Sequence, residues 1–147
     1  MSLKEQLNES MKTAMKARDN LRLSAVRMVR SAIKNREIDS RIEMDDQGII
    51  EVISSLVKQR RESIRMYQEG GRTDLVEKEE AELAVLMEFL PAQLSPDDIN
   101  RLIDQIIAET GATGARDMGR VMKMLAPLTA GKADGKAVSD AVKQKLA

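Results

Sequence analysis

The side chains that most often perform nucleophilic or acid–base chemistry are missing from this sequence. Its 147 residues include no histidine and no cysteine, which removes the usual general base near neutral pH, the thiolate nucleophile and the commonest metal ligands. Carboxylates gather at Glu77, Glu79, Glu80 and Glu82. Their spacing directs them around a helix and not at one point, so they favour a solvated helix face over a metal or acid–base site. The sequence therefore predicts no catalytic residue, no metal site and no cofactor.

Basic residues are the stronger chemical signal, because they recur at helical spacing in three clusters. Lysine and arginine on one helix face can bind the phosphate backbone of a nucleic acid. The chain has only two aromatic residues. We therefore expect such faces to recognise the charge and shape of a nucleic acid and not to stack on its bases. The alternative is that each cluster only keeps a helix soluble. The three clusters are Arg27, Arg30 and Lys34; Lys58, Arg61 and Arg65; and Arg116, Arg120, Lys123, Lys132 and Lys136.

Charge is balanced over the whole chain but not within it. The 24 basic and 24 acidic residues cancel, yet residues 1–40 hold an excess of basic residues and residues 41–90 an excess of acidic ones. A field of the whole protein therefore does not attract nucleic acid, and only local faces can. No apolar run approaches the roughly 20 residues that span a bilayer. We expect a cytoplasmic protein without membrane partners.

The elements that must position these residues are all expected to be α-helices. Apolar residues recur at spacings of three and four, and no alternating strand pattern of useful length appears. The sequence thus predicts an all-α protein with an N-terminal four-helix domain, residues 1–93, followed by a small C-terminal three-helix bundle, residues 95–147. Helices are expected at about residues 3–16, 20–34, 48–69, 75–90, 96–110, 116–126 and 135–146, with a loop over 35–47.

Two helix starts carry recognisable capping patterns. Asp74 with Glu77 fits a capping box, in which each side chain bonds a backbone N–H at the start of the helix. Ser95 followed by Pro96 and two aspartates combines a good N-cap, proline in the first position and acidic residues in the first turn. We expect both segments to begin helices.

Two charged residues fall inside apolar stripes of the helices expected at 48–69 and 75–90. Arg60 interrupts the first stripe and Glu79 the second. If these helices form an antiparallel hairpin that turns around Gly70, residues whose numbers sum to about 139–140 face each other, which pairs Arg60 with Glu79. An unpaired buried charge is too costly to persist. We therefore predict a buried or half-buried Arg60–Glu79 ion pair that fixes the hairpin register; the alternative is an inward-facing polar site.

Five ordered motifs resemble the YqeY family of small bacterial proteins, and the resemblance covers essentially the whole chain. The motifs are KQRRES at 58–63, GRTDL at 71–75, LMEFLP at 86–91, DMGRVMK at 117–123 and GKADGK at 131–136. The last two also resemble the tail domain of GatB, the tRNA-binding subunit of the glutamine-dependent aspartyl/glutamyl-tRNA amidotransferase. The residues that match this tail are Gly119, Val121, Met122 and Lys123, then Gly131, Lys132 and Ala133.

The resemblance to the GatB tail implies a helical module that contacts tRNA. In GatB the catalytic centre is a separate domain, and nothing in this chain matches it. We therefore expect a non-catalytic module that binds tRNA or another structured RNA through basic helix faces, with translation-related proteins as further partners. Two alternatives stay open: a protein-interaction adaptor in translation, marked by an exposed Met/Leu patch, and an accessory or enzyme of the carbon–nitrogen ligase class that uses glutamine as amido donor, marked by a polar pocket with shifted pKa values.

Overall fold

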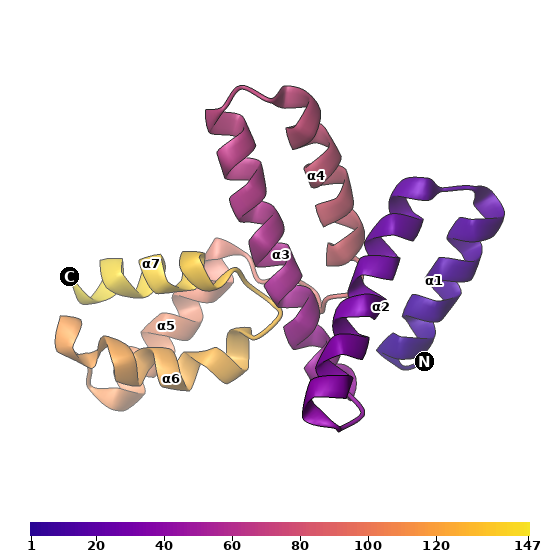
Figure 1. Ribbon diagram of the computed structural model, residues 1–147. Helices are drawn as coiled ribbons and strands as arrows, with labels where there is room; N and C mark the ends of the chain where they lie inside the picture. The colour runs from indigo at the N-terminus through magenta and orange to yellow at the C-terminus, as the bar shows by residue number, and fades with distance from the viewer. The chain divides into compact units, whose positions relative to one another are not determined.

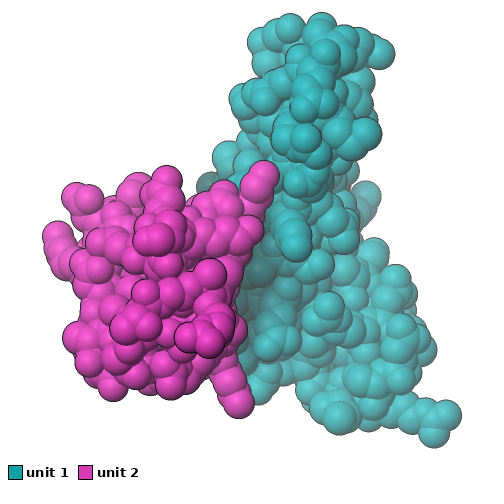
Figure 2. Space-filling view, turned by 90° about the vertical axis from the view of Figure 1, so that its left-hand side faces the viewer, with its two compact units in different colours: residues 1–90 teal, residues 91–147 magenta.

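The computed structural model describes residues 1–147 and contains helices and no strands, which confirms the all-α prediction (Figure 1). The chain forms two compact units, Met1–Leu90 and Pro91–Ala147 (Figure 2). None of the helices combines the length and apolar character needed to cross a bilayer. The helices are α1 (Leu3–Ala17), α2 (Asn20–Ser40), α3 (Asp46–Glu69), α4 (Thr73–Met87), α5 (Pro96–Thr110), α6 (Met118–Thr129) and α7 (Gly135–Leu146), with a short 3₁₀ helix, η1 (Ala115–Asp117), before α6.

The first unit consists of two helical hairpins, α1–α2 and α3–α4 (Figure 1). Helix α2 contacts each of the other three helices. Its apolar face is therefore covered, and Val26 and Val29 are completely buried together with Ile53 of α3 and Leu86 of α4. Burying a Val, Leu or Ile side chain contributes about 1.5–3 kcal/mol. The part of α2 that no helix covers is left to solvent and carries Arg27, Arg30 and Lys34.

Helix α2 is longer than the apolar pattern indicates. We expected a loop from about residue 35, whereas the helix continues to Ser40 and ends at Arg41, whose φ of 59° is left-handed. The added turns are polar, so apolar periodicity gives no sign of them. They are held by tertiary contacts, because Glu37 accepts hydrogen bonds from Lys4 Nζ at 2.6 Å and from the Met44 N–H at 2.8 Å.

Helix α4 begins and ends differently from the prediction. It starts at Thr73, and Arg72 at the N-cap makes no side-chain capping bond, so the expected Asp74–Glu77 capping box is absent. Because the helix begins earlier, Asp74 lies inside the first turn, where it pairs with the Arg72 guanidinium at 3.3 Å. The helix ends at Met87, and residues 88–90 continue in tighter i to i−3 hydrogen bonds before Pro91.

The second unit packs α5, α6 and α7 around one apolar core. The completely buried side chains are Ile103, Val121, Leu125 and Val142, with Val138 at 2% exposure. Helix α5 starts as predicted, since Ser95 and Asp98 form a reciprocal capping box after which Pro96 occupies the first turn. The Ser95 N–H and hydroxyl lower the pKa of the Asp98 carboxyl.

Residues that precede α5 belong to this unit through hydrogen bonds to the turn between α6 and α7. The Leu94 N–H donates to the Lys132 carbonyl at 2.8 Å, and the Gln93 side-chain amide donates to the Gly131 carbonyl at 2.8 Å. Both acceptors lie in the turn between α6 and α7, so the start of the unit and this turn are tied together. We predict that residues 95–147 fold on their own, because their helix caps and apolar faces are complete within them. Circular dichroism of this fragment can check the prediction.

Candidate nucleic-acid interface

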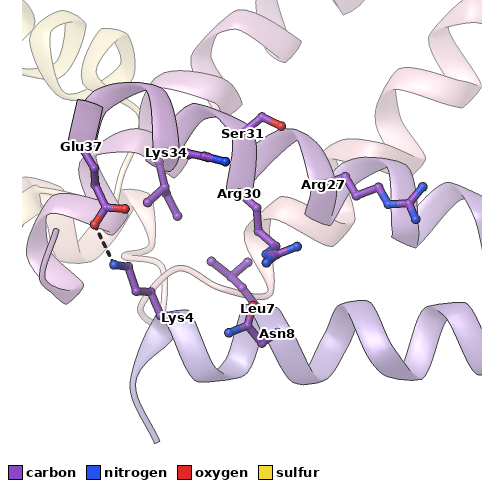
Figure 3. Close-up of a pocket in the computed structure, with 9 residues that line it drawn as sticks. Lys4, Leu7, Asn8, Arg27, Arg30, Ser31, Lys34 and Glu37 are labelled. Atoms are coloured by element: carbon purple, nitrogen blue, oxygen red, sulfur yellow. Dashed lines mark hydrogen bonds and ion pairs between the residues drawn. The ribbon is translucent and has the colours of Figure 1, made fainter. Parts of the chain in front are cut away.

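The predicted cluster on α2 lines an open groove between α1 and α2. Arg27, Arg30 and Lys34 are exposed, and they line the groove beside the buried Ile33. The groove has a volume of about 570 Å³. Figure 3 shows Arg30 reaching from α2 toward Asn8 of α1. The structure therefore brings the three basic residues of this cluster to one concave surface.

These three cations are not neutralised by the protein. Arg27 and Lys34 form no ion pair in the structure. Arg30 Nη1 lies 2.8 Å from the sulfur of Met11, and a thioether is a weak hydrogen-bond acceptor that carries no charge. The groove therefore presents three positive charges that remain available to an anion.

One end of the groove is closed by an ion-pair network that the sequence did not indicate. Lys4 Nζ lies 2.6 Å from Glu37 Oε2 and 3.2 Å from Glu43 Oε1. The Lys4 ammonium and, after it, the Met44 N–H hold the pKa of Glu37 below its ordinary value. Glu37 in turn is the main cause of the raised pKa of Lys4. Lys4 is far from Glu37 in sequence, so no local spacing pairs them.

The α3 cluster has a different electrostatic setting. Arg65 is held between Glu62, at 2.8 Å, and Glu69, at 3.3 Å, and its pKa is raised chiefly by the hydrogen bond to Glu62. Lys58 is exposed on the same helix. Because carboxylates one turn away occupy Arg65, this cluster offers less free positive charge than the one on α2.

The C-terminal cluster is spread along α6 and its two ends. Arg120 pairs with Asp117 at 3.1 Å. The pKa of Asp117 is lowered chiefly by the Thr113 N–H and further by the Arg120 charge. The other four cations, Arg116, Lys123, Lys132 and Lys136, are exposed and form no ion pair.

These five cations do not converge on one point. Arg116 precedes α6 and Lys132 follows it, and a helix of 12 residues is about 18 Å long. Such a row suits an extended polyanion better than a single small anion. Arg120 and Lys123, one turn apart on α6, form its middle.

The predicted Arg60–Glu79 ion pair is present in the α3–α4 hairpin. Arg60 Nη1 lies 2.5 Å from Glu79 Oε2, with side-chain exposures of 19% and 15%. The same nitrogen lies 2.6 Å from Glu82 Oε2, and Arg60 Nη2 lies 2.9 Å from the sulfur of Met28 on α2. One guanidinium thus forms ion pairs with two carboxylates where α2, α3 and α4 meet.

Glu82 corrects the expectation of a solvated glutamate face on α4. Its residue exposure is 6%, which makes it one of the two buried polar residues of the protein. Glu82 follows Glu79 by three positions and therefore shares its side of the helix. That spacing was the available signal, because two acidic residues on an inward face both need a cation.

The carboxylates with shifted pKa values occupy ion pairs and helix caps. Glu37, Asp74, Glu88, Asp98 and Asp117 all have lowered pKa values. A lowered pKa makes a carboxylate a weaker base, so we assign these groups to structure and not to proton transfer. No three acidic side chains converge into a metal-binding group.

Comparison with known proteins shows the family of this chain. The family model described as Yqey-like protein matches residues 4–146. The chain therefore belongs to the YqeY family, as the five motifs predicted. The further likeness to the GatB tail stays a prediction.

Several curated relatives share the name "Altered inheritance of mitochondria protein 41, mitochondrial". The protein of Eremothecium gossypii is 33% identical over 96% of this chain and 79% of its own length. The protein of Kluyveromyces lactis is 37% identical over 70% of this chain and 57% of its own length. That of Lachancea thermotolerans is 38% identical over 57% of this chain and 46% of its own length. The chain thus spans about half the length of two of these relatives.

These names correct two expectations. The relatives are designated mitochondrial, which contradicts the cytoplasmic location expected from composition, and that expectation is wrong. The relatives come from yeasts, so the bacterial origin implied by the family resemblance is not supported by them either. Composition could not correct either expectation, because neither the compartment nor the organism is encoded in the charge and hydropathy of a helical domain.

Proposed function

We propose that this protein is a non-catalytic module that binds tRNA or another structured RNA through the phosphate backbone. The observation that carries the proposal is that cations on two separate surfaces remain unpaired in a chain of net charge zero. These are the α2 face and the C-terminal row. They are Arg27, Arg30 and Lys34 on α2, and Arg116, Lys123, Lys132 and Lys136 around α6.

The chemistry of these surfaces fits phosphate recognition. Lysine and arginine that neutralise phosphates release condensed counterions, and this term supplies most of the affinity of sequence-independent binding. With Tyr67 and Phe89 as the only aromatic residues, the protein has few groups on which unpaired bases could stack. The likeness of residues 117–136 to the tail of a tRNA-binding subunit supports the same conclusion.

The test reverses two charges in the middle of the C-terminal row. We expect the double variant Arg120→Glu, Lys123→Glu to bind unfractionated tRNA more weakly than the wild type at low salt. The plot of log affinity against log salt concentration has a negative slope. If both residues contact phosphates, this slope should become less steep by roughly 2 in the variant. Filter binding at several salt concentrations measures both quantities.

The matched control is Lys58→Glu, Arg65→Glu on α3, which changes the net charge equally at a cluster where two carboxylates hold Arg65, whereas Arg120 pairs with Asp117 alone and Lys123 has no ion pair. This control should retain most of the tRNA affinity. Equal tRNA binding by the wild type and the Arg120→Glu, Lys123→Glu variant would overturn the proposal.

A protein-interaction role has one observation in its favour. Met124 and Leu128 are exposed by 42% and 46% and lie four residues apart on α6, on one side of the helix. In cross-linking from lysate, Met124→Lys with Leu128→Lys should lose protein partners and keep tRNA if this face docks a protein. Loss of neither would leave the apolar pair without a role in binding.

A further inference from the structure

We propose that the α1–α2 groove binds a phosphate monoester, either on a free nucleotide or at the end of an RNA chain. The inference deepens the proposed function, because the α2 face is one of its two surfaces. It differs in kind, since it assigns a concave site for one terminal phosphate and not a surface for a polyanion.

The free positive charge in the groove matches the negative charge of a phosphate monoester. A phosphate monoester carries about −1.5 to −2 charges near neutral pH and three acceptor oxygens. A phosphate within a nucleic-acid backbone carries one negative charge, and two of its oxygens are esterified. Arg30 and Lys34, which lie four residues apart on α2, can supply two charge-assisted hydrogen bonds to one phosphate, and Arg27 adds a third positive charge to the lining.

The groove also has room for the group to which the phosphate is attached. Its volume of about 570 Å³ lies within the range of small-ligand pockets, roughly 300–1,000 Å³. Leu7 and Ile33, which are 1% and 4% exposed, form its apolar floor. Asn8 and Ser31 add polar groups to the lining (Figure 3). An organic group resting on this floor can therefore be oriented by hydrogen bonds.

Lys34 forms no ion pair with Glu37, although both residues line the same end of the groove. Glu37 follows Lys34 by three residues, which is the spacing at which helix neighbours form ion pairs. Glu37 instead accepts from Lys4 Nζ at 2.6 Å (Figure 3) and from the Met44 N–H at 2.8 Å. Because these two donors occupy its carboxylate, Lys34 remains available to a ligand.

The first experiment titrates the full-length protein with adenosine 5′-monophosphate and, separately, with adenosine. Amide chemical shifts measured by NMR report where each compound binds. We expect the monophosphate to shift amides of α1 and α2, and adenosine to bind at least tenfold more weakly because it lacks the charged group. Equal affinities, or shifts confined to other helices, would overturn the inference.

Variants connect that binding to the groove. Arg30→Gln with Lys34→Gln should weaken monophosphate binding by roughly tenfold for each charge-assisted hydrogen bond lost. Ser31→Glu, at an exposed position, places a negative charge in the groove and should abolish binding while the helix stays folded by circular dichroism. The matched control Lys58→Gln, Arg65→Gln should bind as the wild type does. Binding that survives both groove variants would refute the site.

RNA oligonucleotides separate the two sources of the phosphate. A 5′-phosphorylated oligonucleotide that binds better than its 5′-hydroxyl form supports a terminal phosphate of RNA. Monophosphate binding without such a preference supports a free nucleotide. If tRNA binding fails but the monophosphate still binds the groove, the proposed function falls and this site stands. If tRNA binds and neither phosphate-dependent preference is seen, the site falls alone.

Discussion

The arginines in the middle of α2 and those of α3 are used in opposite ways, although both helices belong to the first unit. In α1–α2, Arg27 and Arg30 are exposed without a carboxylate partner. In α3–α4, Arg60 lies against two carboxylates with 19% of its side chain exposed, and Arg65 is held by two more. The neighbouring acidic residues therefore decide whether a basic helix face stabilises the fold or remains available for binding.

The largest effect is expected when Arg60 is removed. Arg60→Ala leaves Glu79 and Glu82 without their shared cation, and Glu82 is only 6% exposed as a residue. Loss of one partner from a buried ion pair costs about 3–5 kcal/mol, and we expect about 3 kcal/mol because Arg60 is partly exposed. Urea denaturation of the full chain measures the free energy of unfolding. A loss below about 1 kcal/mol would show that the three charges contribute little to the hairpin.

Replacing all three charged residues with apolar ones should recover most of the lost stability. The triple variant Arg60→Met, Glu79→Leu, Glu82→Leu should unfold within about 1 kcal/mol of the wild type, because well-packed apolar residues can replace a buried ion pair. The double variant Arg60→Met, Glu79→Leu keeps a buried Glu82 without a cation, so it should remain strongly destabilised. Equal stability of the double and triple variants would exclude Glu82 from the ion-pair cluster.

An arginine of the other hairpin should behave differently. Arg27→Gln removes an exposed cation without an ion pair, so the free energy of unfolding should change by less than about 0.5 kcal/mol. The same denaturation measurement applies. A loss comparable to that of Arg60→Ala would contradict the contrast between the two hairpins.

Acid should act on the Lys4–Glu37 ion pair, which links α1 to α2. The pKa of Glu37 is lowered by Lys4 and the Met44 N–H. A folded pKa below the unfolded value means that the stabilisation is complete above the ordinary value of 4.5 and is lost as the pH falls through the lower folded value. Thermal unfolding from about pH 6 to about pH 3 should show a decrease in Tm that is smaller in Glu37→Gln. An identical decrease in both proteins would place the acid sensitivity elsewhere.

The sequence contained enough information for the parts of the fold that depend on apolar spacing. The stripes of α2 and α5, and the Ser95 cap, predicted those helices because the signal lies within a few residues. The polar end of α2 was missed, since Glu37 is held there by Lys4 across the hairpin. Contacts between distant residues leave no local pattern, and the groove depends on just such a contact.

The Arg60–Glu79 pair is the exception among long-range contacts. It was predictable because both residues violate apolar stripes and because a short turn at Gly70–Gly71 limits the register. Glu82 was missed since two other glutamates of α4, Glu77 and Glu80, are exposed, and composition does not distinguish them from Glu82. The groove cations were identified as a helix face, but their concave setting required the position of α1.

Hydrogen bonds from residues 93 and 94 order the turn between α6 and α7, which lowers the conformational entropy that binding would cost there. The Gly131 and Lys132 carbonyls accept hydrogen bonds from Gln93 and Leu94, so the backbone that carries Lys132 is already ordered. Ordering one residue of free backbone costs about 1–2 kcal/mol. A phosphate that meets Lys132 therefore restricts only the lysine side chain, whereas a lysine on a loose loop would lose the freedom of its backbone as well.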